Sequence, residues 1–389
     1  MAEFQKEWAA QKKWNPFNSD KLLAQVYRWR KISEGSPIPQ PGLVTVDPIN
    51  VCNHKCVWCN AGYILEKNSR AISRETLFEL ADFFVEWKGH PEWEKGVEAI
   101  CIAGGGEPLL NKSVGDFIDR CVDNGIEVGV VTHGGLIDRY LEPLSKCTWV
   151  GVSIDSGTGE TFKKLKQRDS FDKIIENVKL LTEYSKKNNT TLAGPGQGYG
   201  VSYKYLLHSE NAHEIYTAAK IAKEAGCKNF HLRPVGDPWF KVNSENEHKI
   251  EFSPDIIEVF NKQVDKAREL EDDDFGVFGI THKFDDKLDK SNKFRQCFSV
   301  FMTAVFMPSE DASGKFDLGL CCDRRGDDRL TLGKSLESTS QVDDLWGSEK
   351  HWDIHKQIRV NECPRCTYQP HNQIFEHVVL SDNMTYRFI

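Results

Sequence analysis

The sequence predicts an α/β protein built around a parallel β-sheet. Between Leu43 and Val235, six apolar, strand-like runs alternate with segments whose apolar residues repeat at helical spacing. Strands that alternate with helices in this way form parallel sheets joined by right-handed crossovers. The alternation alone leaves open whether the sheet is open or closed into a barrel. In either architecture, reactive groups belong at the carboxyl ends of the strands.

Each predicted strand is a short apolar run, and each predicted helix carries an apolar stripe. The strands are expected at residues 43–49, 97–103, 126–132, 149–154, 201–207 and 229–235. One helical stripe, with residues at i, i+3, i+4 and i+7, consists of Leu77, Leu80, Ala81 and Phe84. Asn211 and Glu214 have the spacing of a capping box at the start of a later helix, which Gly226 would end.

The composition is that of a globular chain with an acidic balance. Of the 389 residues, 39% are hydrophobic and 28% are charged, and the net charge is −8. Broad nucleic-acid binding is not expected, because it requires a basic face. No apolar run reaches the roughly 18 residues of a membrane span, and the N-terminus lacks the apolar core of a signal peptide. We therefore expect a reduced, cytoplasmic setting, in which twelve cysteines indicate metal binding rather than disulfides.

Three cysteines follow the first predicted strand in a C-x3-C-x2-C array formed by Cys52, Cys56 and Cys59. Thiolates are soft ligands that suit iron–sulfur clusters or zinc. A closed structural zinc site has four protein ligands, so three cysteines leave one metal position open for a small molecule. Two alternatives remain on spacing alone. His54 or a distant residue could complete a zinc site, or the cysteines could be buried and structural.

A C-x3-C-x2-C array with an aromatic residue before its last cysteine resembles the signature of the radical S-adenosylmethionine (radical SAM) enzymes. The resemblance implies a partial (β/α)6 barrel in which Cys52, Cys56 and Cys59 hold a [4Fe–4S] cluster and Trp58 lies near the adenine of SAM. In that family SAM chelates the fourth iron. One electron then cleaves SAM to methionine and a 5′-deoxyadenosyl radical, which takes a hydrogen atom from the substrate. A donor such as flavodoxin or ferredoxin is expected to supply the electron.

Two further motifs match the same family. Residues Gly105, Gly106 and Glu107 follow the second predicted strand and match its GGEP motif, which holds the methionine amino group of SAM. A glycine-rich turn is by itself a common tight connection, since glycine exposes the backbone at close range. Ser153 and Asp155 end the fourth strand in a matching S-x-D pattern. Ser153 is the candidate for polar contact with SAM, whereas Asp155 could instead hold the loop or a substrate hydroxyl. A simple Asx-turn by Asp155 is the alternative.

Polar residues also lie near the ends of the third and sixth strands, where no family motif assigns them a role. His133 stands where the family often has asparagine, and the sequence assigns it no role. On the sixth strand, His231 and Arg233 point to the same side. If that side is the barrel interior, Arg233 is a candidate active-site cation for a carboxylate or phosphate. A surface ion pair is the alternative.

A second set of cysteines lies in the last quarter of the chain and comprises Cys297, the pair Cys321-Cys322, Cys363 and Cys366. Four such ligands suit tetrahedral zinc or a second [4Fe–4S] cluster. Their arrangement resembles the Twitch domain, the shortened SPASM domain that follows some radical SAM barrels and carries one auxiliary cluster. Strand neighbours face opposite sides, so one of Cys321 and Cys322 is expected to be a ligand while the other packs or is free. We choose Cys321 to join Cys297, Cys363 and Cys366.

The sequence thus divides into an N-terminal helical extension (1–42), a barrel (43–240), a helical connector (241–296) and a small α+β cluster-binding domain (297–389). Asp323, Arg324 and Arg325 are candidates to line the substrate cavity. The cysteines outside both ligand sets are expected in the core, and these are Cys101, Cys121, Cys147 and Cys227.

The favoured function is the oxidation, rearrangement or epimerisation of a small polar substrate, either sugar-like or nucleotide-linked. The resemblance carries this interpretation, because the Twitch arrangement is similar to that of dehydrogenases that oxidise an aminocyclitol. The first alternative is a maturase of ribosomal peptides, although no winged-helix peptide-recognition region is evident at the N-terminus. The second is a non-catalytic protein that binds zinc or an iron–sulfur cluster.

Overall fold

The computed structural model describes residues 24–65, 69–196, 198–236, 239, 252–279, 294–311, 314–363 and 366–381. Within these ranges the strands form one sheet in the order β10-β9-β8-β1-β2-β3-β4-β5-β6-β7. The strands from β8 through β1 to β7 each pair parallel with the next strand in this order. The pairs β8–β9 and β9–β10 are antiparallel. The strands are β1 (Leu43–Val46), β2 (Ala99–Ile102), β3 (Glu127–Thr132), β4 (Trp149–Ser153), β5 (Gly200–Leu207), β6 (Asn229–Pro234), β7 (Gly276–Gly279), β8 (Thr303–Pro308), β9 (Phe316–Gly319) and β10 (Thr331–Leu336).

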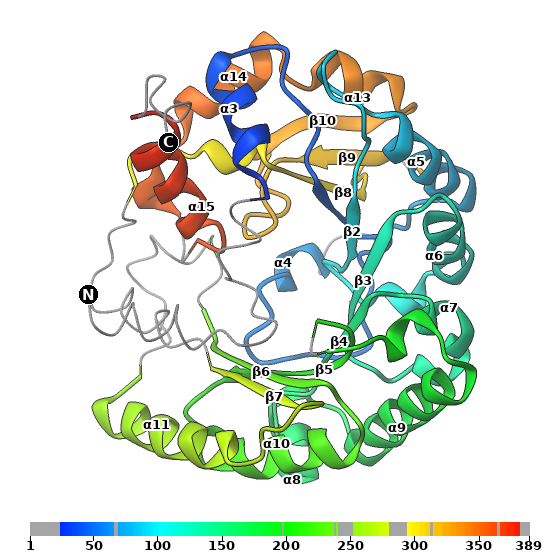
Figure 1. Ribbon diagram of the computed structural model, residues 1–389, viewed down its shortest axis with the longest axis vertical. Helices are drawn as coiled ribbons and strands as arrows, with labels where there is room; N and C mark the ends of the chain where they lie inside the picture. Colours follow the sequence, from blue (N-terminus) through cyan, green and yellow to red (C-terminus); the bar gives the residue numbers. More distant parts are fainter. Residues whose placement is uncertain are drawn as a thin grey trace.

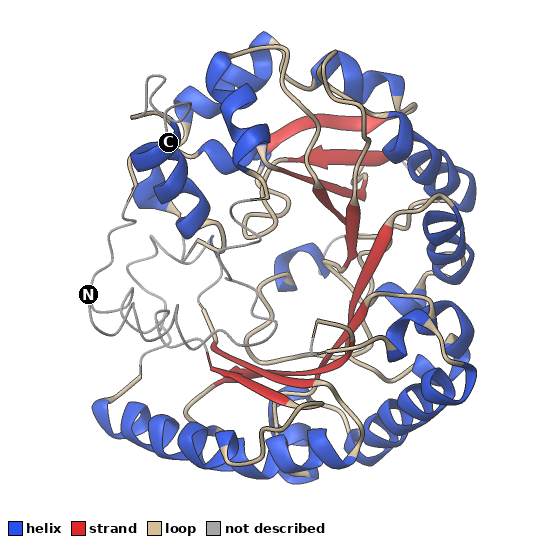
Figure 2. Cartoon of the chain, viewed as in Figure 1, coloured by secondary structure: helices blue, strands red, loops and turns tan. Residues whose placement is uncertain are grey.

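The sheet bends into an open arc with helices along its convex side and α4 within its concave side (Figures 1 and 2). The prediction of an α/β fold with a parallel sheet is confirmed, and the arc is a partial barrel. The helices are α3 (Val26–Glu34), α4 (Gly62–Leu65), α5 (Arg74–Glu86), α6 (Val114–Asp123), α7 (Leu141–Ser145), α8 (Gly159–Lys166), α9 (Phe171–Asn188), α10 (Ile215–Glu224), α11 (Pro254–Arg268), α13 (Ser340–Leu345), α14 (Glu349–Gln357) and α15 (Gln369–Ile374).

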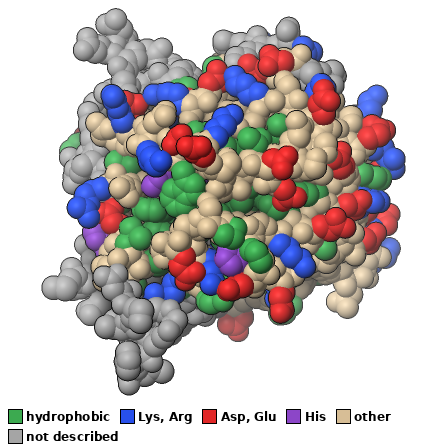
Figure 3. All heavy atoms as spheres, turned by 90° about the horizontal axis from the view of Figure 1, so that it is seen from above, with side chains coloured by type: hydrophobic (Ala, Val, Ile, Leu, Met, Phe, Trp, Pro, Cys, Tyr) green, Lys and Arg blue, Asp and Glu red, His purple; other side chains and the backbone are tan. Residues whose placement is uncertain are grey.

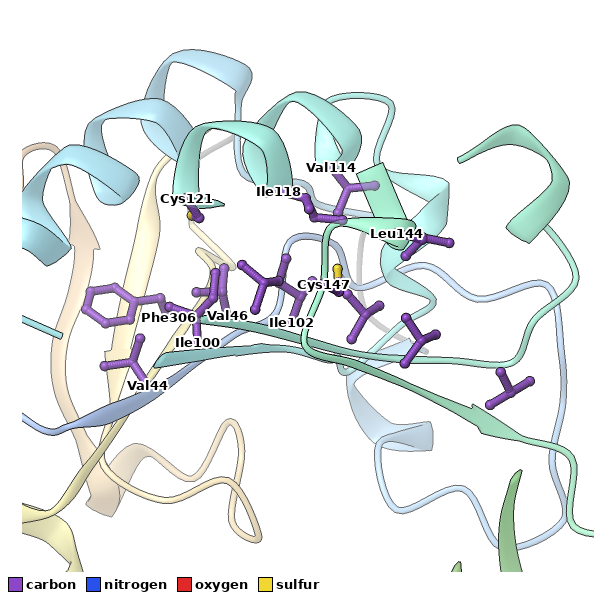
Figure 4. Packing of buried hydrophobic residues seen from close by; sticks show 14 of the residues in the cluster. Val44, Val46, Ile100, Ile102, Val114, Ile118, Cys121, Leu144, Cys147 and Phe306 are labelled. Atoms are coloured by element: carbon purple, nitrogen blue, oxygen red, sulfur yellow. The ribbon is translucent and has the colours of Figure 1, made fainter. Parts of the chain in front are cut away.

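Strand alternation separates the core from the concave face of the sheet. Val44, Val46, Ile100 and Ile102 are fully or almost fully buried, and they point toward the helices (Figure 4). There they pack near side chains of α6 and α7, including Ile118. Because successive strand residues face opposite sides, the residues between them face the interior of the arc. The site must therefore be built from the alternate positions and from the loops at the carboxyl ends of the strands.

The predicted connector and C-terminal domain both contribute strands to the sheet of the barrel. Within 241–296, α11 is followed by β7, a strand that sequence reasoning missed, and β7 pairs parallel with β6. Beyond residue 296, β8 pairs parallel with β1 in a register that places Phe306 beside Val46. Residues 1–23 of the predicted N-terminal extension, and 240–251 and 280–293 of the connector region, lie outside the described residues.

Helix α3 lies within 24–42, the described part of the N-terminal extension, and packs between the barrel and the C-terminal segment. Trp29 and Ile32 belong to the main core, and Trp29 meets His371 of α15 edge to face at 5.7 Å. Arg28 forms an ion pair with Glu98, just before β2, at 2.9 Å. The helix therefore helps to hold the two ends of the described chain together.

The predicted capping box before α10 is wrong. Neither Asn211 nor Glu214 caps the following turn through its side chain. Asn211 instead receives the backbone N–H of His208 at 2.8 Å and donates to the backbone oxygen of Asp155 at 2.8 Å. Glu214 accepts the backbone N–H of Gly157 at 2.7 Å. Both side chains therefore bind the loop after β4, because tertiary partners compete with local capping.

No helix in the described part of the chain combines the length and apolar character needed to span a bilayer. The face of the molecule seen in Figure 3 carries acidic and basic side chains interspersed, with hydrophobic side chains gathered toward its middle. The described residues on that face form no uniformly basic surface, in keeping with the net charge of −8.

The packing of Phe306 predicts that the C-terminal strands share one cooperative core with the barrel. Its ring is fully buried. The ring centroid lies 5.0 Å from that of Phe84 in α5 and 6.2 Å from that of Trp87, the C-cap of α5. Phe306→Ala should lower the free energy of unfolding by about 3–5 kcal/mol in a single denaturant transition. The exposed Val378→Ala is the control and should change it little. Two separated transitions, with only one affected, would contradict a shared core.

Candidate active site

The three cysteines of the C-x3-C-x2-C array lie in a loop at the carboxyl end of β1, ahead of α4. Cys52, Cys56 and Cys59 form no disulfide and are partly accessible. Two backbone hydrogen bonds tie the loop to the end of α8. Lys55 donates to the backbone oxygen of Lys166 at 3.2 Å, and Val57 donates to that of Leu165 at 3.0 Å. The loop is thereby tied to α8, the helix that follows β4.

The glycine-rich loop after β2 lies in direct contact with the cysteine loop. The backbone N–H of Glu107 donates to the backbone oxygen of Val51 at 2.8 Å. A Cβ on Gly106 would stand 2.3 Å from that same oxygen, so only glycine permits this approach. A Cβ on Gly105 would be 3.3 Å from Ile64 of α4. The two loops that the sequence singled out are therefore neighbours.

Glu107 is almost completely buried and accepts hydrogen bonds from three donors. Its Oε2 accepts the backbone N–H of His133 at 2.8 Å. Its Oε1 accepts the hydroxyl of Thr132 and the backbone N–H of Leu109. Burial raises the pKa of Glu107 to about 7, and the hydrogen bonds from His133, Thr132 and Leu109 oppose that rise. The carboxyl is thus held rigidly in a site where a cation would stabilise its ionised form.

His133 and His54 stack face to face beside the buried carboxyl, with ring centroids 3.9 Å apart and planes 7° from parallel. The ring Nε2 of His133 lies 2.6 Å from Oδ1 of Asn53, in the cysteine loop. Burial lowers the pKa of each histidine to about 3, so both rings are neutral. Sequence reasoning named His133 without a role and did not foresee this stack.

The loop after β4 holds Asp155 in a buried ion pair with Lys166. Asp155 has a φ of 61° and also accepts the backbone N–H of Leu206 at 2.6 Å. Its carboxylate therefore secures the loop, the role left open for it in the sequence, and an Asx-turn is not needed. Lys166 was missed by sequence reasoning, although it lies near the cysteine loop and contributes to the electrostatics of Cys56 and Cys59.

Trp58 lies beside this ion pair, with Nζ of Lys166 5.6 Å from the centroid of its ring. Trp58 is buried in a small cluster with Leu165 and Val235, its ring centroid 5.4 Å from that of His208. Ser153 ends β4 and is partly accessible. These positions make an aromatic and a hydroxyl available around the same end of the barrel, which is the end that carries the thiols.

The interior of the arc carries basic and thiol side chains. Lys204 of β5 lies 3.2 Å from Nδ1 of His231 and 4.9 Å from the ring centroid of Trp149. Arg233, two residues further along β6, is exposed and forms no ion pair with another described residue. Cys101 alternates with Ile100 and Ile102 and so faces this interior, which corrects its expected place in the core. Cys121, Cys147 and Cys227 are buried, as predicted.

Comparison with known proteins identifies the family of this site. Residues 46–200 match the model of the radical SAM superfamily, and this range contains the cysteine loop, Glu107 and the Ser153–Asp155 segment.

The chain contains a radical SAM domain.

Curated relatives cover only part of the chain. The molybdenum cofactor biosynthesis protein moc-5 of Caenorhabditis elegans is 26% identical over 49% of this chain and 30% of its own length. A GTP 3′,8-cyclase of Aliarcobacter butzleri is 29% identical over 35% of this chain and 41% of its own length. A probable GTP 3′,8-cyclase of Saccharolobus islandicus is 23% identical over 48% of this chain and 56% of its own length. The matches therefore span between 30% and 56% of these relatives.

Solved structures share the fold over most of the chain. SuiB of Streptococcus suis, bound to S-adenosylmethionine, matches with a TM-score of 0.61 and 14% identity over 92% of this chain and 78% of its own. The protein anSMEcpe with bound AdoMet matches with a TM-score of 0.54 and 17% identity over 81% of this chain and 83% of its own. At these identities the likeness establishes the fold alone.

The side chains of the radical SAM domain fit a cluster better than a single metal ion. No group of three or more His, Cys, Asp or Glu among the described residues surrounds one point as ligands of one ion would. A [4Fe–4S] cluster instead takes each thiolate on a different iron, which spaces the ligands more widely. Burial raises the pKa of Cys52 to about 11, so an electropositive group is needed to hold it as a thiolate.

His54 gives a second indication of a missing neighbour. Its side chain is buried, and its Nδ1 forms no hydrogen bond with any described residue. Its backbone N–H donates to Sγ of Cys52 at 3.4 Å, so the ring stands beside the thiol array. An unsatisfied buried nitrogen costs free energy unless a partner occupies the site.

The four C-terminal cysteines lie close enough to affect one another electrostatically. Burial is the largest cause of the raised pKa of Cys366, and the thiols of Cys297 and Cys321 raise this pKa further. The thiol of Cys363 likewise raises the pKa of Cys297. Cys322 faces elsewhere, toward Cys101 and the hydroxyl of Tyr368, which lies 3.7 Å from its Sγ.

Of the two arginines that follow the cysteine pair, Arg325 connects this region to the radical SAM domain and Arg324 binds within the region. Arg325 pairs with the buried Asp47 at 2.5 Å, just after β1, and donates to the backbone oxygen of Cys322. Arg324 pairs with Asp327 and donates to Sγ of Cys363 at 3.5 Å. The carboxylate of Asp323 accepts the backbone N–H of Thr367 at 2.7 Å. All three side chains have protein partners, and their expected place in the lining of a substrate cavity stays a prediction.

The raised pKa of Glu107 predicts how stability depends on pH. The folded cluster-free protein binds a proton more tightly than an unfolded carboxyl with a pKa near 4.5, so this contribution is full below about pH 4.5. It is lost as the pH rises through about 7, a change of about 3 kcal/mol in the free energy of unfolding. Glu107→Gln should remove that slope in urea titrations between pH 4 and 8. The exposed Glu183→Gln should retain it, and an unchanged slope in Glu107→Gln would contradict the buried carboxyl.

Proposed function

We propose that this chain is a radical SAM enzyme in which Cys52, Cys56 and Cys59 hold a [4Fe–4S] cluster with one iron left for SAM. The observation that supports this most strongly is the contact between the cysteine loop and the Glu107 loop at the carboxyl ends of β1 and β2. A bound and reduced cluster supplies the electron that cleaves SAM to methionine and a 5′-deoxyadenosyl radical. The remaining work of the protein is to bind, orient and shield the reactants.

The residues around the cysteine loop supply the contacts that SAM requires. The carboxylate of Glu107 has spare lone pairs for the methionine ammonium, and Gly105 and Gly106 bring backbone groups within reach of it. Ser153 is the proposed hydroxyl contact, and Trp58 offers an aromatic face near the adenine. Asp155 acts indirectly by holding the loop through Lys166.

For the substrate we favour a small polar molecule, either sugar-like or nucleotide-linked. The interior of the arc offers Lys204, His231 and the proposed cation Arg233 for an anionic or hydroxyl-rich group. Several curated relatives are GTP 3′,8-cyclases, which supports the nucleotide-linked class. The reaction would be an oxidation, epimerisation or rearrangement that follows hydrogen abstraction. A flavodoxin or ferredoxin as electron donor and a cytoplasmic location remain predictions.

The C-terminal cysteines are proposed to hold an auxiliary [4Fe–4S] cluster in a Twitch-like region. The mutual electrostatic effects of Cys297, Cys321, Cys363 and Cys366 support one shared site. Their burial implies protonated thiols in the absence of metal, since each pKa is raised. A cluster there would accept an electron from a substrate radical, which is the step an oxidation needs.

A peptide maturase is the second candidate. SuiB was solved with its precursor peptide SuiA, and that structure matches 92% of this chain with a TM-score of 0.58. The match extends past the radical SAM domain into the C-terminal region. At 14% identity it supports the shared architecture more than a shared substrate.

Iron content tests whether the protein binds two clusters and whether Cys321, rather than Cys322, is a ligand of the second. Anaerobically reconstituted protein should bind about eight irons, roughly four per cluster, and no zinc. Cys321→Ser should lose about half of that iron, whereas the matched variant Cys322→Ser should keep it. Loss of iron in Cys322→Ser alone would reverse the ligand assignment. Stoichiometric zinc in the wild type, without SAM cleavage, would favour the non-catalytic alternative.

Hydrogen transfer distinguishes the substrate classes. Anaerobic turnover would be followed by mass spectrometry of 5′-deoxyadenosine with three labelled probes, namely ribose-deuterated GTP, a deuterated aminocyclitol and a deuterated precursor peptide. We expect deuterium in 5′-deoxyadenosine from one of the two small polar probes, at a rate above that of unproductive SAM cleavage. Transfer from the peptide alone would replace the small-molecule proposal with the maturase.

A further inference from the structure

His133, at the carboxyl end of β3, bridges the Glu107 loop and the cysteine loop. Its backbone N–H donates to Oε2 of Glu107 at 2.8 Å. Its ring, only 7% exposed, reaches Asn53 with Nε2 at 2.6 Å from Oδ1. Asn53 lies directly after Cys52. One residue thus contacts both of the loops that the proposed SAM site needs in a fixed relation.

The hydrogen bonds around the His133 ring determine its tautomer. The backbone N–H of Gly135 donates to Nδ1 at 2.9 Å, so Nδ1 is an unprotonated acceptor. The proton of the neutral ring is therefore on Nε2, which donates to Asn53. Because the ring is fixed at both nitrogens, the N–H points in one direction, toward the cysteine loop.

The face of the same ring supports the next residue of the loop. His54 stacks on His133 at 3.9 Å and meets Phe162 edge to face at 5.9 Å on another side. Arg168 donates to the backbone oxygen of Asn53. The chain between Cys52 and Cys56 is thereby held by a directed hydrogen bond, a stacked ring and a guanidinium.

We propose that His133 is a positioning residue that fixes the segment between Cys52 and Cys56 through its hydrogen bond to Asn53 and its stack on His54. It thereby sets the geometry and reduction potential of the cluster. This inference rests on the proposed function, because it takes the cysteine triplet to be the cluster site. Hydrogen bonding and ligand orientation around a metal centre tune its potential, so a change at His133 should be measurable there.

The first experiment measures the contact in metal-free protein by amide hydrogen exchange of residues 51–57. His133→Phe keeps a flat ring over His54 but has no donor for Asn53, whereas His133→Gln keeps both a donor and an acceptor. Losing one hydrogen bond should speed exchange in His133→Phe by about fivefold, and His133→Gln should stay near the wild type. Asn53→Ala should match His133→Phe, and the double variant should be no faster, because both changes remove the same bond. Unchanged or additive effects would overturn the proposal.

The second experiment measures the reduction potential of the reconstituted cluster by EPR-monitored titration. A purely structural role would leave the potential of the surviving folded protein unchanged. We expect equal shifts in His133→Phe and Asn53→Ala, no further shift in the double variant, and rescue in His133→Gln. A constant potential would overturn the proposal while leaving the cluster assignment intact. Wild-type protein that binds no iron would overturn the proposed function itself, and coupling seen only in hydrogen exchange would then reduce His133 to a structural contact.

Discussion

The close approach of Gly106 to Val51 is the constraint on which the site depends. A Cβ at Gly106 would lie 2.3 Å from the oxygen of Val51 and 2.8 Å from that of Ile49, distances that no side chain tolerates. Because the backbones meet there, the hydrogen bond from Glu107 to Val51 can form and the two loops share one position. The parallel pairing of β1 with β2 brings both loops to the same edge of the sheet. The thiols and the buried carboxyl are neighbours for this reason.

The electrostatics of the site follow from its burial. Glu107, the thiols and the two histidines all have pKa values displaced toward their neutral forms, with desolvation as the largest cause. The buried carboxylates of Asp155 and Asp47 are paired, with Lys166 and Arg325 respectively. A buried site of neutral groups gains most from a ligand that brings positive charge. An iron cluster and an ammonium group are ligands of that kind, which connects the packing to the proposed chemistry.

The sequence predicted the parts of this structure that depend on local pattern and missed those that depend on long-range contact. Alternating apolar runs located the strands from β1 to β6, and the cysteine and glycine motifs located both loops. The short β7 was missed because its Gly-Val-Phe-Gly run carries little apolar signal and its stability comes from pairing with β6. Lys166 and Asn53 were missed for a related reason. Their roles arise from neighbours far along the chain. Lys166 belongs to no recognisable motif, and Asn53 lies between two cysteines of the motif, where the spacing assigns it no role. The union of β8 with β1 likewise joins segments about 260 residues apart, a contact no local pattern encodes.

The most direct test of the central claim is the formation of 5′-deoxyadenosine. Anaerobically reconstituted protein would be incubated with SAM and excess dithionite, and the products separated by chromatography with mass detection. The account predicts 5′-deoxyadenosine and methionine in equal amounts, and neither from a variant in which Cys52, Cys56 and Cys59 are all replaced by alanine. Intact SAM after incubation with the iron-loaded wild type would contradict it.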